Sequence, residues 1–542
     1  MLYKLPGAMI VLLMCATLLP AQKNDAFQTA MYMEKWQKAV TFQEERCKTA
    51  PTDWLDWLQM ADAYNAASRP IDAKTALQNA AKYASQSAHT HIIAGRIALL
   101  DARQDEAILQ FKKAVKAGKK DVATLRLIGE SWLYGPRRDL RRAETLLLDA
   151  QRGDNHDFLT HMNLGYCYKA QLDGGKALVY FDLAQAIRPD DPLPALMSAL
   201  AYKSAKVEAR QLEYLDKALA IDPQCREALR QKAELFYYKR RNYEAAAESY
   251  ASLFKINPKA PITDKMAYVN CLFLTKQYEP TIAWVEKIIG EDGSRNYLRR
   301  LAAYSHYEMG NFEKGKSIMD EYFQHVATEK IISQDYEYYA KFLQKENQDS
   351  LAAVYYEKAI ELDPTRWDLY AEIGSIRYKA KDYLGAAEAY ERRLDSMTTR
   401  TALDYYQVGI ARYMLRDSVN YERAAGYFAK VCDIVPYKTI GWLMQAKALS
   451  KLEPDVETYP ERVGEFGKAK EAFVQFVEIA ERQPDKHKKD LVSAYEYLAY
   501  YYILQKDAEP VQAYHQKILA LEPANETALG IAGWLQRVEA ED

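Results

Sequence analysis

Cysteine is scarce in this chain, and its few copies follow no pairing pattern. Six occur in 542 residues, and five of them lie beyond residue 21: Cys47, Cys167, Cys225, Cys271 and Cys432. Their number is odd and no C-x-x-C is present. The sequence therefore predicts no obligatory disulfide framework, even in an oxidising compartment.

Motifs that carry catalysis or phosphate binding are also missing. The chain has no H-E-x-x-H, no G-x-x-x-x-G-K-[ST], no G-x-S-x-G and no G-x-G-x-x-G. Its histidines show no ligand-like spacing, and no pair of carboxylates is singled out for acid–base chemistry. We therefore expect a protein that is not an enzyme and that has no metal site and no cofactor.

Neither sign of charge predominates. The chain has 73 basic and 75 acidic residues, for a net charge of −2. This balance disfavours nucleic acid as a partner, because such proteins carry a basic surface. Beyond residue 21, no apolar run reaches the length that spans a bilayer. By contrast, tyrosine is abundant, with 42 copies against 15 phenylalanines, and its rigid amphipathic ring suits both helix packing and protein interfaces.

A repeat of about 34 residues runs through the chain. Its clearest copy, from Phe158 to Pro189, has residues at fixed offsets: Leu164, Gly165, Tyr168, Ala177, Phe181, Ala184 and Pro189. The small residues Gly165 and Ala177 allow two helices to approach closely at their crossing, and Pro189 ends the second helix. About thirteen copies start near residues 54, 88, 122, 158, 192, 227, 261, 296, 333, 367, 402, 439 and 492.

This spacing resembles the tetratricopeptide repeat (TPR) family. The resemblance implies an all-α fold, a right-handed α-solenoid of helix-turn-helix repeats that bury their apolar faces against their neighbours. The stretch from Ala446 to Pro523 is also similar to the end of exported all-TPR proteins of Gram-negative bacteria.

The first 21 residues read as a secretory signal peptide. Lys4 precedes an apolar stretch from Ala8 to Leu19, and a small residue, Ala21, stands before the expected cleavage at Gln22. The alternative is a buried core helix. Cys15 raises the further alternative of a lipid anchor, although Met14 stands where a lipobox has a small residue.

The remaining chain divides by the same frame. We predict an N-terminal capping helix over 22–53, a TPR array of about eleven repeats over 54–438, and C-terminal TPRs over 439–525 with an insertion at 451–467. A second capping helix is predicted over 526–542, since terminal repeats need their exposed faces covered.

In the TPR family, positions 2, 5, 9 and 12 of each first helix commonly face a concave groove. Carried onto this sequence, they predict a tyrosine-rich partner-binding surface with scattered cations: Tyr166, Lys169, Lys203, Tyr238, Tyr297, Arg300, Tyr304, Tyr307, Lys341, Tyr378, Tyr406, Tyr413 and Tyr500. Its densest part is the patch Tyr297, Arg300, Tyr304 and Tyr307, whose offsets share one helical face. Ordinary packing between repeats is the alternative role for these residues.

Four arginines fall within an insertion of one repeat: Arg137, Arg138, Arg141 and Arg142. Guanidinium groups bind carboxylates or phosphates through paired hydrogen bonds, so an anion-binding patch is one interpretation. An exposed loop is the other.

These observations predict an exported TPR scaffold or adaptor that binds protein or peptide partners through its groove, in an envelope assembly or secretion complex. Periplasmic location is expected, with outer-membrane association through a complex as a variant. The alternative is a structural subunit of a membrane-anchored complex with no free peptide-binding role. The sequence leaves the oligomeric state open.

Overall fold

The computed structural model describes residues 26–541, and the predicted signal peptide and Cys15 lie outside them. The described chain is helical and contains no β-strand, which confirms the all-α prediction. It divides into two compact units, one ending at Gln277 (unit 1) and one beginning at Tyr278 (unit 2).

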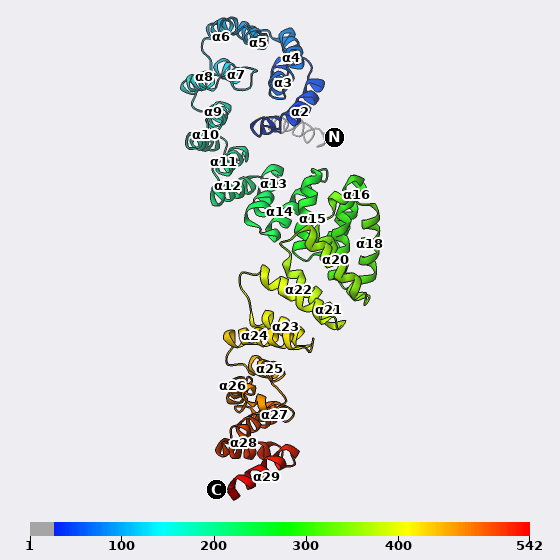
Figure 1. Cartoon of the computed structure of the whole chain (residues 1–542). Coiled ribbons are helices and arrows are strands. Elements are labelled where there is room, and N and C mark those ends of the chain that lie inside the picture. Colours follow the sequence, from blue (N-terminus) through cyan, green and yellow to red (C-terminus); the bar gives the residue numbers. More distant parts are fainter. Residues whose placement is uncertain (1–25, 542) are drawn as a thin grey trace, which may run out of the picture. The chain divides into compact units, whose positions relative to one another are not determined.

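Within the described residues, unit 1 begins with helical residues 26–32, which are followed by consecutive antiparallel helices (Figure 1). Their bounds are α2 Trp36–Thr49, α3 Trp54–Ala66, α4 Pro70–Tyr83, α5 Ser87–Leu100, α6 Gln104–Ala117, α7 Val122–Leu133, α8 Leu140–Gly153, α9 Phe158–Ala170, α10 Gly174–Ile187, α11 Leu193–Ser204, α12 Glu208–Ile221, α13 Arg226–Glu234, the π-helix η1 Leu235–Arg240, α14 Tyr243–Ile256 and α15 Ile262–Leu274.

Unit 2 continues the same pattern, with short 3₁₀ turns before several helices. Its bounds are α16 Tyr278–Glu291, η2 Gly293–Leu298, α17 Arg299–Glu308, α18 Phe312–His325, η3 Thr328–Lys330, α19 Ser333–Lys345, α20 Asp349–Leu362, η4 Trp367–Leu369, α21 Tyr370–Lys379, α22 Tyr383–Ser396, α23 Ala402–Tyr413, α24 Ser418–Ile434, α25 Thr439–Ser450, η5 Pro460–Glu465, α26 Lys470–Ala480, α27 Pro484–Leu504, α28 Ala508–Leu521 and α29 Glu526–Glu541.

The repeat frame matches these helices closely. Each predicted start falls within three residues of the first residue of a helix or of the 3₁₀ turn before it, except the last, because α27 begins eight residues before Val492. We call the first helix of each repeat the A helix and the second the B helix. Acidic residues begin many of them; Asp157, for example, accepts a hydrogen bond from the backbone N–H of Thr160 and so caps α9.

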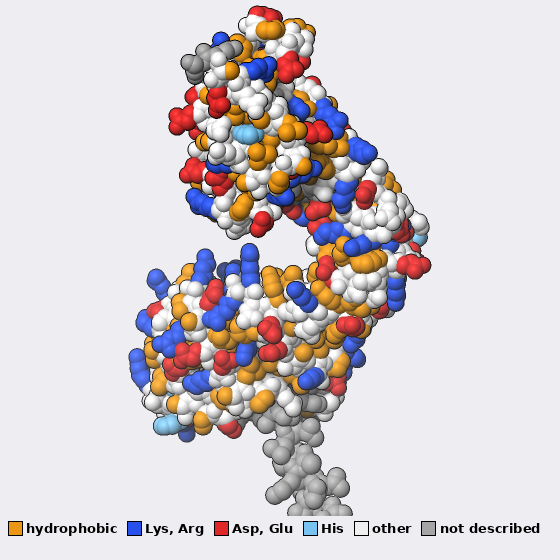
Figure 2. Space-filling view, turned by 90° about the horizontal axis from the view of Figure 1, so that it is seen from below, with side chains coloured by type: hydrophobic (Ala, Val, Ile, Leu, Met, Phe, Trp, Pro, Cys, Tyr) orange, Lys and Arg blue, Asp and Glu red, His pale blue; other side chains and the backbone are white. Residues whose placement is uncertain are grey.

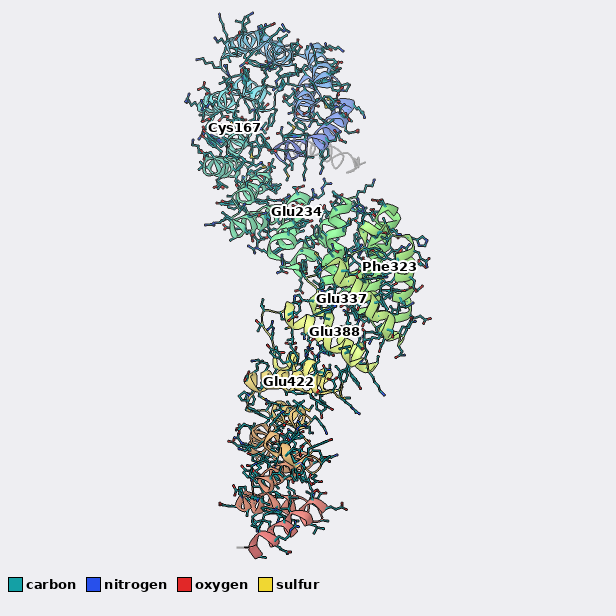
Figure 3. The ribbon with its side chains drawn as sticks, viewed as in Figure 1. Cys167, Glu234, Phe323, Glu337, Glu388 and Glu422 are labelled. Carbon is teal, nitrogen blue, oxygen red and sulfur yellow. The ribbon has the colours of Figure 1, made fainter. Side chains whose placement is uncertain are left out.

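Close helix crossings occur where the frame places a small residue. A Cβ atom added to Gly165 would lie 2.4 Å from the Phe181 ring, and one added to Gly95 would lie 2.4 Å from the Phe111 ring. Cys167 and Cys271 are fully buried in their A helices and act as small core residues (Cys167 is labelled in Figure 3). The five cysteines of the described chain are all free thiols.

The two ends of the described chain differ from each other. At the C-terminus, α29 covers the last repeat with Ala528, Ile531 and Leu535. At the N-terminus, the helix predicted over 22–53 is interrupted: Glu34 adopts a left-handed backbone, with φ of 58°, between the stretch 26–32 and α2. This break redirects the first residues away from the line of α2.

The insertion at 451–467 is ordered against α27. Glu453 accepts hydrogen bonds from the Tyr497 hydroxyl at 2.7 Å and from the backbone N–H of Ala469 at 2.8 Å. The Phe466 ring stacks on that of Tyr497, with centroids 5.4 Å apart. The long connection is therefore held on the solenoid as part of the fold.

Candidate functional site

The candidate site is the inner face of unit 1, which the A helices line. Figure 1 shows α3 to α13 following a curve, from blue through cyan to green, with α2 on its inner side. Residues 26–35, which we call the N-terminal segment, contact helices α9 and α13 from this position, although these helices are more than a hundred residues away in sequence. The chain therefore places one of its own helices in its concave groove.

Tyr32 is the most deeply inserted side chain of the N-terminal segment. It is fully buried, and its hydroxyl donates a hydrogen bond of 2.8 Å to Oδ1 of Asn163 on α9. Its ring meets that of Tyr166 edge to face, with centroids 5.8 Å apart. Burial, reinforced by the Glu130 carboxylate, raises the pKa of Tyr32 well above its usual value, so the hydroxyl stays protonated and donates.

A polar network behind Asn163 fixes the acceptor for Tyr32. The Asn163 amide nitrogen donates to Glu130 at 2.8 Å, and Glu130 pairs with Arg126 at 3.0 Å. Arg126 also pairs with Asp157 at 3.2 Å. Because Glu130 accepts from the amide nitrogen of Asn163, the amide oxygen is directed toward the Tyr32 hydroxyl.

Two charges at the end of the N-terminal segment complete its contacts. The Glu34 carboxylate accepts from the Tyr166 hydroxyl at 3.3 Å and lies 3.6 Å from the Lys169 ammonium. The Lys35 ammonium forms an ion pair with Glu227 on α13. Although burial alone would raise it, the Lys35 charge holds the pKa of Glu227 below its usual value. The groove thus contains a hydrogen-bond acceptor at Asn163, a cation at Lys169 and an anion at Glu227, which contact Tyr32, Glu34 and Lys35 in that order.

The N-terminal segment does not fill the groove. A cavity of about 720 Å³ remains between it and the starts of α11 and α13. Its walls include Met33 and Phe42 on one side and Leu193 and Leu196 on the other, and Lys38 and Arg226 contribute cations. This space adjoins the Lys35–Glu227 ion pair, and Asp190, Asp191 and Asp222 also line it.

The groove residues predicted in unit 1 are only partly brought together. Tyr166 and Lys169 are adjacent, with the ammonium 5.6 Å from the ring centroid, and both contact the N-terminal segment. Lys203 is exposed on α11 and donates to Gln231 at 2.7 Å and pairs with Glu234 at 3.2 Å (Glu234 is labelled in Figure 3). Tyr238 is 64% exposed on η1, and its ring meets that of Tyr237 edge to face, with centroids 4.7 Å apart.

The densest predicted patch is brought together in unit 2, but mostly inside the fold. Arg300 is 8% exposed and Tyr304 1% exposed. The Tyr304 hydroxyl donates to Asp335 on α19, and Arg300 donates to the Tyr322 hydroxyl at 2.7 Å and lies 3.5 Å from Asp335. Tyr297 and Tyr307 lie at intermediate exposure beside them. In this conformation Arg300 and Tyr304 contribute to packing between repeats, and their role in binding stays a prediction.

The other predicted groove residues of unit 2 are half-buried and lie on successive repeats. Lys341 pairs with Glu337 at 2.7 Å, and Glu337 also pairs with Arg366 at 2.8 Å (Glu337 is labelled in Figure 3). The remaining tyrosines contact neighbouring aromatic rings: Tyr378 with Tyr383, Tyr406 with Phe428, Tyr413 with Tyr421, and Tyr500 with Phe466.

The four arginines do not all lie in a loop as predicted: Arg137 and Arg138 precede α8, whereas Arg141 and Arg142 are in its first turn. Arg142 pairs with Asp139 at 2.9 Å and lies over the Trp132 ring at 5.1 Å, and Arg138 lies over the Tyr166 ring at 5.6 Å. Arg137, Arg138 and Arg141 line one pocket of about 630 Å³. Anion binding there stays a prediction. Figure 2 shows basic and acidic side chains interspersed over the face in view.

Sequence reasoning missed Asn163 and Glu227, the two groove residues that hold Tyr32 and Lys35. They stand at positions 6 and 1 of their repeats, outside the four positions assigned to the groove. The available signal was a polar residue, such as Asn163, inside an otherwise apolar A helix. The four groove positions of the family do not include the position of Asn163.

Within 26–541, no group of three or more His, Cys, Asp or Glu side chains is arranged to hold a metal ion. Over the same residues, no helix combines the length and apolarity needed to cross a bilayer.

His306 is expected to make the stability of unit 2 depend on pH. It is 5% exposed on α17, and neither ring nitrogen has a hydrogen-bonding partner within residues 26–541. Burial, and then the charge of Lys314, lower the pKa of His306. The unfolded chain therefore binds the proton first, and stability falls as the pH drops through about 6.5.

We expect His306→Phe to reduce the loss of urea resistance between pH 7.5 and pH 5. The exposed His325, replaced in the same way, is the control; equal pH slopes for wild type and His306→Phe would contradict the assignment.

No family model matches the sequence, and no curated protein matches it. Solved structures do. The C-terminal part of a TPR repeat-containing protein from Cytophaga hutchinsonii is 31% identical over 49% of this chain and 98% of its own, with a TM-score of 0.37. A TPR protein from Parabacteroides merdae is 17% identical over 47% of this chain and 98% of its own, with a TM-score of 0.29. YrrB, described as a TPR protein with an unusual peptide-binding site, is 20% identical over 35% of this chain and 97% of its own, with a TM-score of 0.24.

The TM-scores are low, so the family assignment does not depend on the superpositions. The assignment depends on two other observations. The sequence identity to the Cytophaga protein is 31% over nearly its whole length. The repeat frame also matches the observed helices along the chain, with a close crossing at Gly165 and at Gly95. The chain therefore belongs to the tetratricopeptide repeat family.

Proposed function

We propose that this chain is an exported scaffold that binds protein partners through the concave groove of unit 1. The observation that carries the proposal is the occupied groove itself. Its inner face holds a helix through buried aromatic contact, an oriented amide and two ion pairs, which is the kind of surface that binds an amphipathic helix. The proposed location is the periplasm, either free or at the outer membrane within an assembly or secretion complex.

Export is supported by the sequence at residues 1–21. The mass of the chain purified from its native cell tests this part. A chain that begins at Gln22 supports cleavage, and a chain with acyl groups on Cys15 would favour the membrane-anchored alternative.

Partner binding is tested by site-specific photo-cross-linking in the native cell. A photoreactive residue at Lys203, exposed on the A helix α11, is compared with one at Val179, which is 56% exposed on the B helix α10. We expect a defined set of proteins to be cross-linked from position 203 and not from position 179. Equal capture at the two positions, or none at either, would contradict a groove-specific binding function.

A further inference from the structure

The N-terminal segment has the features of a bound ligand. Four of its side chains are buried: Phe27, Ala30 and Met31 lie on one helical face and share a cluster, and Tyr32 is buried in a second cluster. Tyr32 reaches Asn163, Glu34 reaches Tyr166 and Lys169, and Lys35 reaches Glu227. The groove therefore contacts an aromatic side chain, then a carboxylate and then an ammonium along the segment.

The segment is joined to α2 by a tight turn. Glu34 has a left-handed backbone there, the conformation that Ser68 and Leu172 also adopt at turns between other helices. Beyond this turn, Ala39 and Val40 of α2 share a cluster with the segment, whereas Gln43 donates to Asp56 of α3 and Cys47 belongs to another cluster. The hydrogen bond from Gln43 to Asp56 does not involve the segment.

The segment covers apolar surface that another chain would have to cover. Phe27, Ala30 and Met31 share a cluster with Ala63 of α3 and contact Tyr134, which follows α7. If the segment left, this surface would be exposed to water, which is unfavourable. A replacement must therefore be an amphipathic helix, and charge alone does not suffice.

We infer that residues 26–35 are a built-in mimic of the partner, and that the groove of unit 1 binds a helix of another protein that presents an aromatic residue followed by an acidic and then a basic one. This inference rests on the proposed scaffold function. It specifies the ligand that the groove binds and the segment that regulates binding. The mimic occupies Asn163, Tyr166, Lys169 and Glu227, so a partner gains these contacts only by displacing it. The cavity of about 720 Å³ beside the Lys35–Glu227 pair is the side from which a second chain enters.

Tethering gives the mimic an advantage. A segment joined to its site by a short connection has an effective concentration on the order of millimolar. The apparent affinity for a partner falls in proportion to the fraction of molecules whose groove is open. Weakening the mimic should therefore increase partner affinity without any change in the groove.

The test uses the full mature chain and a labelled synthetic peptide of residues 26–35 as the probe. Lys35→Glu places two carboxylates together at Glu227 and releases the mimic, while the groove stays wild type. We expect this chain to bind the wild-type peptide at least tenfold more tightly than the wild-type chain does, in fluorescence anisotropy. Lys48→Glu is the matched control, since it makes the same charge change on an exposed part of α2, and it should bind like wild type. Equal affinities for wild type and Lys35→Glu would overturn the inference.

A charge exchange tests the register of the ligand. The Glu227→Lys chain should prefer the peptide with Lys35→Glu, and the Lys35→Glu chain should prefer the wild-type peptide. The same preference in both chains would show that Glu227 does not read the ligand. A wild-type chain that forms dimers by exchanging N-terminal segments would identify a second copy as the occupant and overturn the assignment to another protein.

The cross-linking at position 203 separates this inference from the proposed function. Stronger capture of the same cellular proteins by Lys35→Glu than by wild type supports both. Equal capture by the two chains would overturn the mimic and leave the scaffold function standing. No capture by either chain would overturn the scaffold function.

Discussion

Asp335→Ala is expected to lower the free energy of unfolding of unit 2 by about 3–5 kcal/mol, because it leaves a buried charge without its partner. Asp335 is fully buried at the start of α19. Its carboxylate accepts hydrogen bonds from the hydroxyls of Tyr304 and Tyr322 and from the backbone N–H of Ile332. The Arg300 guanidinium lies 3.5 Å away, and this carboxylate balances its charge.

The measurement is a urea unfolding curve of the full chain followed by tyrosine fluorescence and circular dichroism. Glu361→Ala, which removes an exposed carboxylate from the next helix, is the control and should change stability by less than about 0.5 kcal/mol. A loss for Asp335→Ala no larger than that of the control would show that the network contributes little to the fold.

The same network changes what is expected of the tyrosine patch. Burial, together with the Asp335 carboxylate, raises the pKa of Tyr304 well above its usual value, so its hydroxyl remains a donor. Its ring stacks on Tyr338 with centroids 4.0 Å apart. Removal of the Tyr304 or Arg300 side chain should therefore lower the free energy of unfolding. Any loss of partner affinity in these variants must be compared with their loss of stability.

The fold was predictable because each repeat encodes its own geometry. Gly165 and Phe181 are a fixed number of residues apart, and the helix crossing they form needs no information from other repeats. The same holds for Gly95 and Phe111, which make the same contact in another repeat. Such local encoding is typical of solenoids, in which each repeat contacts only its neighbours.

The occupied groove was not predictable for the opposite reason. Tyr32 and Asn163 are separated by 131 residues, and Lys35 and Glu227 by 192. Neither pair follows from a period of about 34 residues, and Tyr32 belongs to no repeat. The positions assigned to the groove also differ in exposure: Tyr238 is 64% exposed and Tyr304 1% exposed, since the latter meets Asp335 of the next repeat. Position within the repeat sets the direction of a side chain, and the neighbouring repeat decides whether it is accessible.

The second large effect is expected at a helix crossing in unit 1. Gly165→Leu should lower the free energy of unfolding by about 3 kcal/mol, at the upper end of the range for overpacked cores. A Cβ atom at this position already lies 2.4 to 3.0 Å from three atoms of the Phe181 ring. Phe181 is fully buried, so its ring has no free space to move into. The crossing of α9 and α10 must open, and α9 is the helix that presents Asn163, Tyr166 and Lys169 to the groove.

Gly175→Leu provides the matched control for this substitution. Gly175 is exposed in the first turn of α10, and a Cβ atom there would approach no closer than 3.7 Å to another residue. Because leucine is the better helix former, the control should match or exceed wild-type stability by up to about 1 kcal/mol. Adding Phe181→Leu to Gly165→Leu should recover part of the lost stability, since the two side chains compete for one volume. Unfolding curves for Gly165→Leu and Gly175→Leu that coincide would show that the crossing at Gly165 is not close, and the packing of the repeat would then need a different explanation.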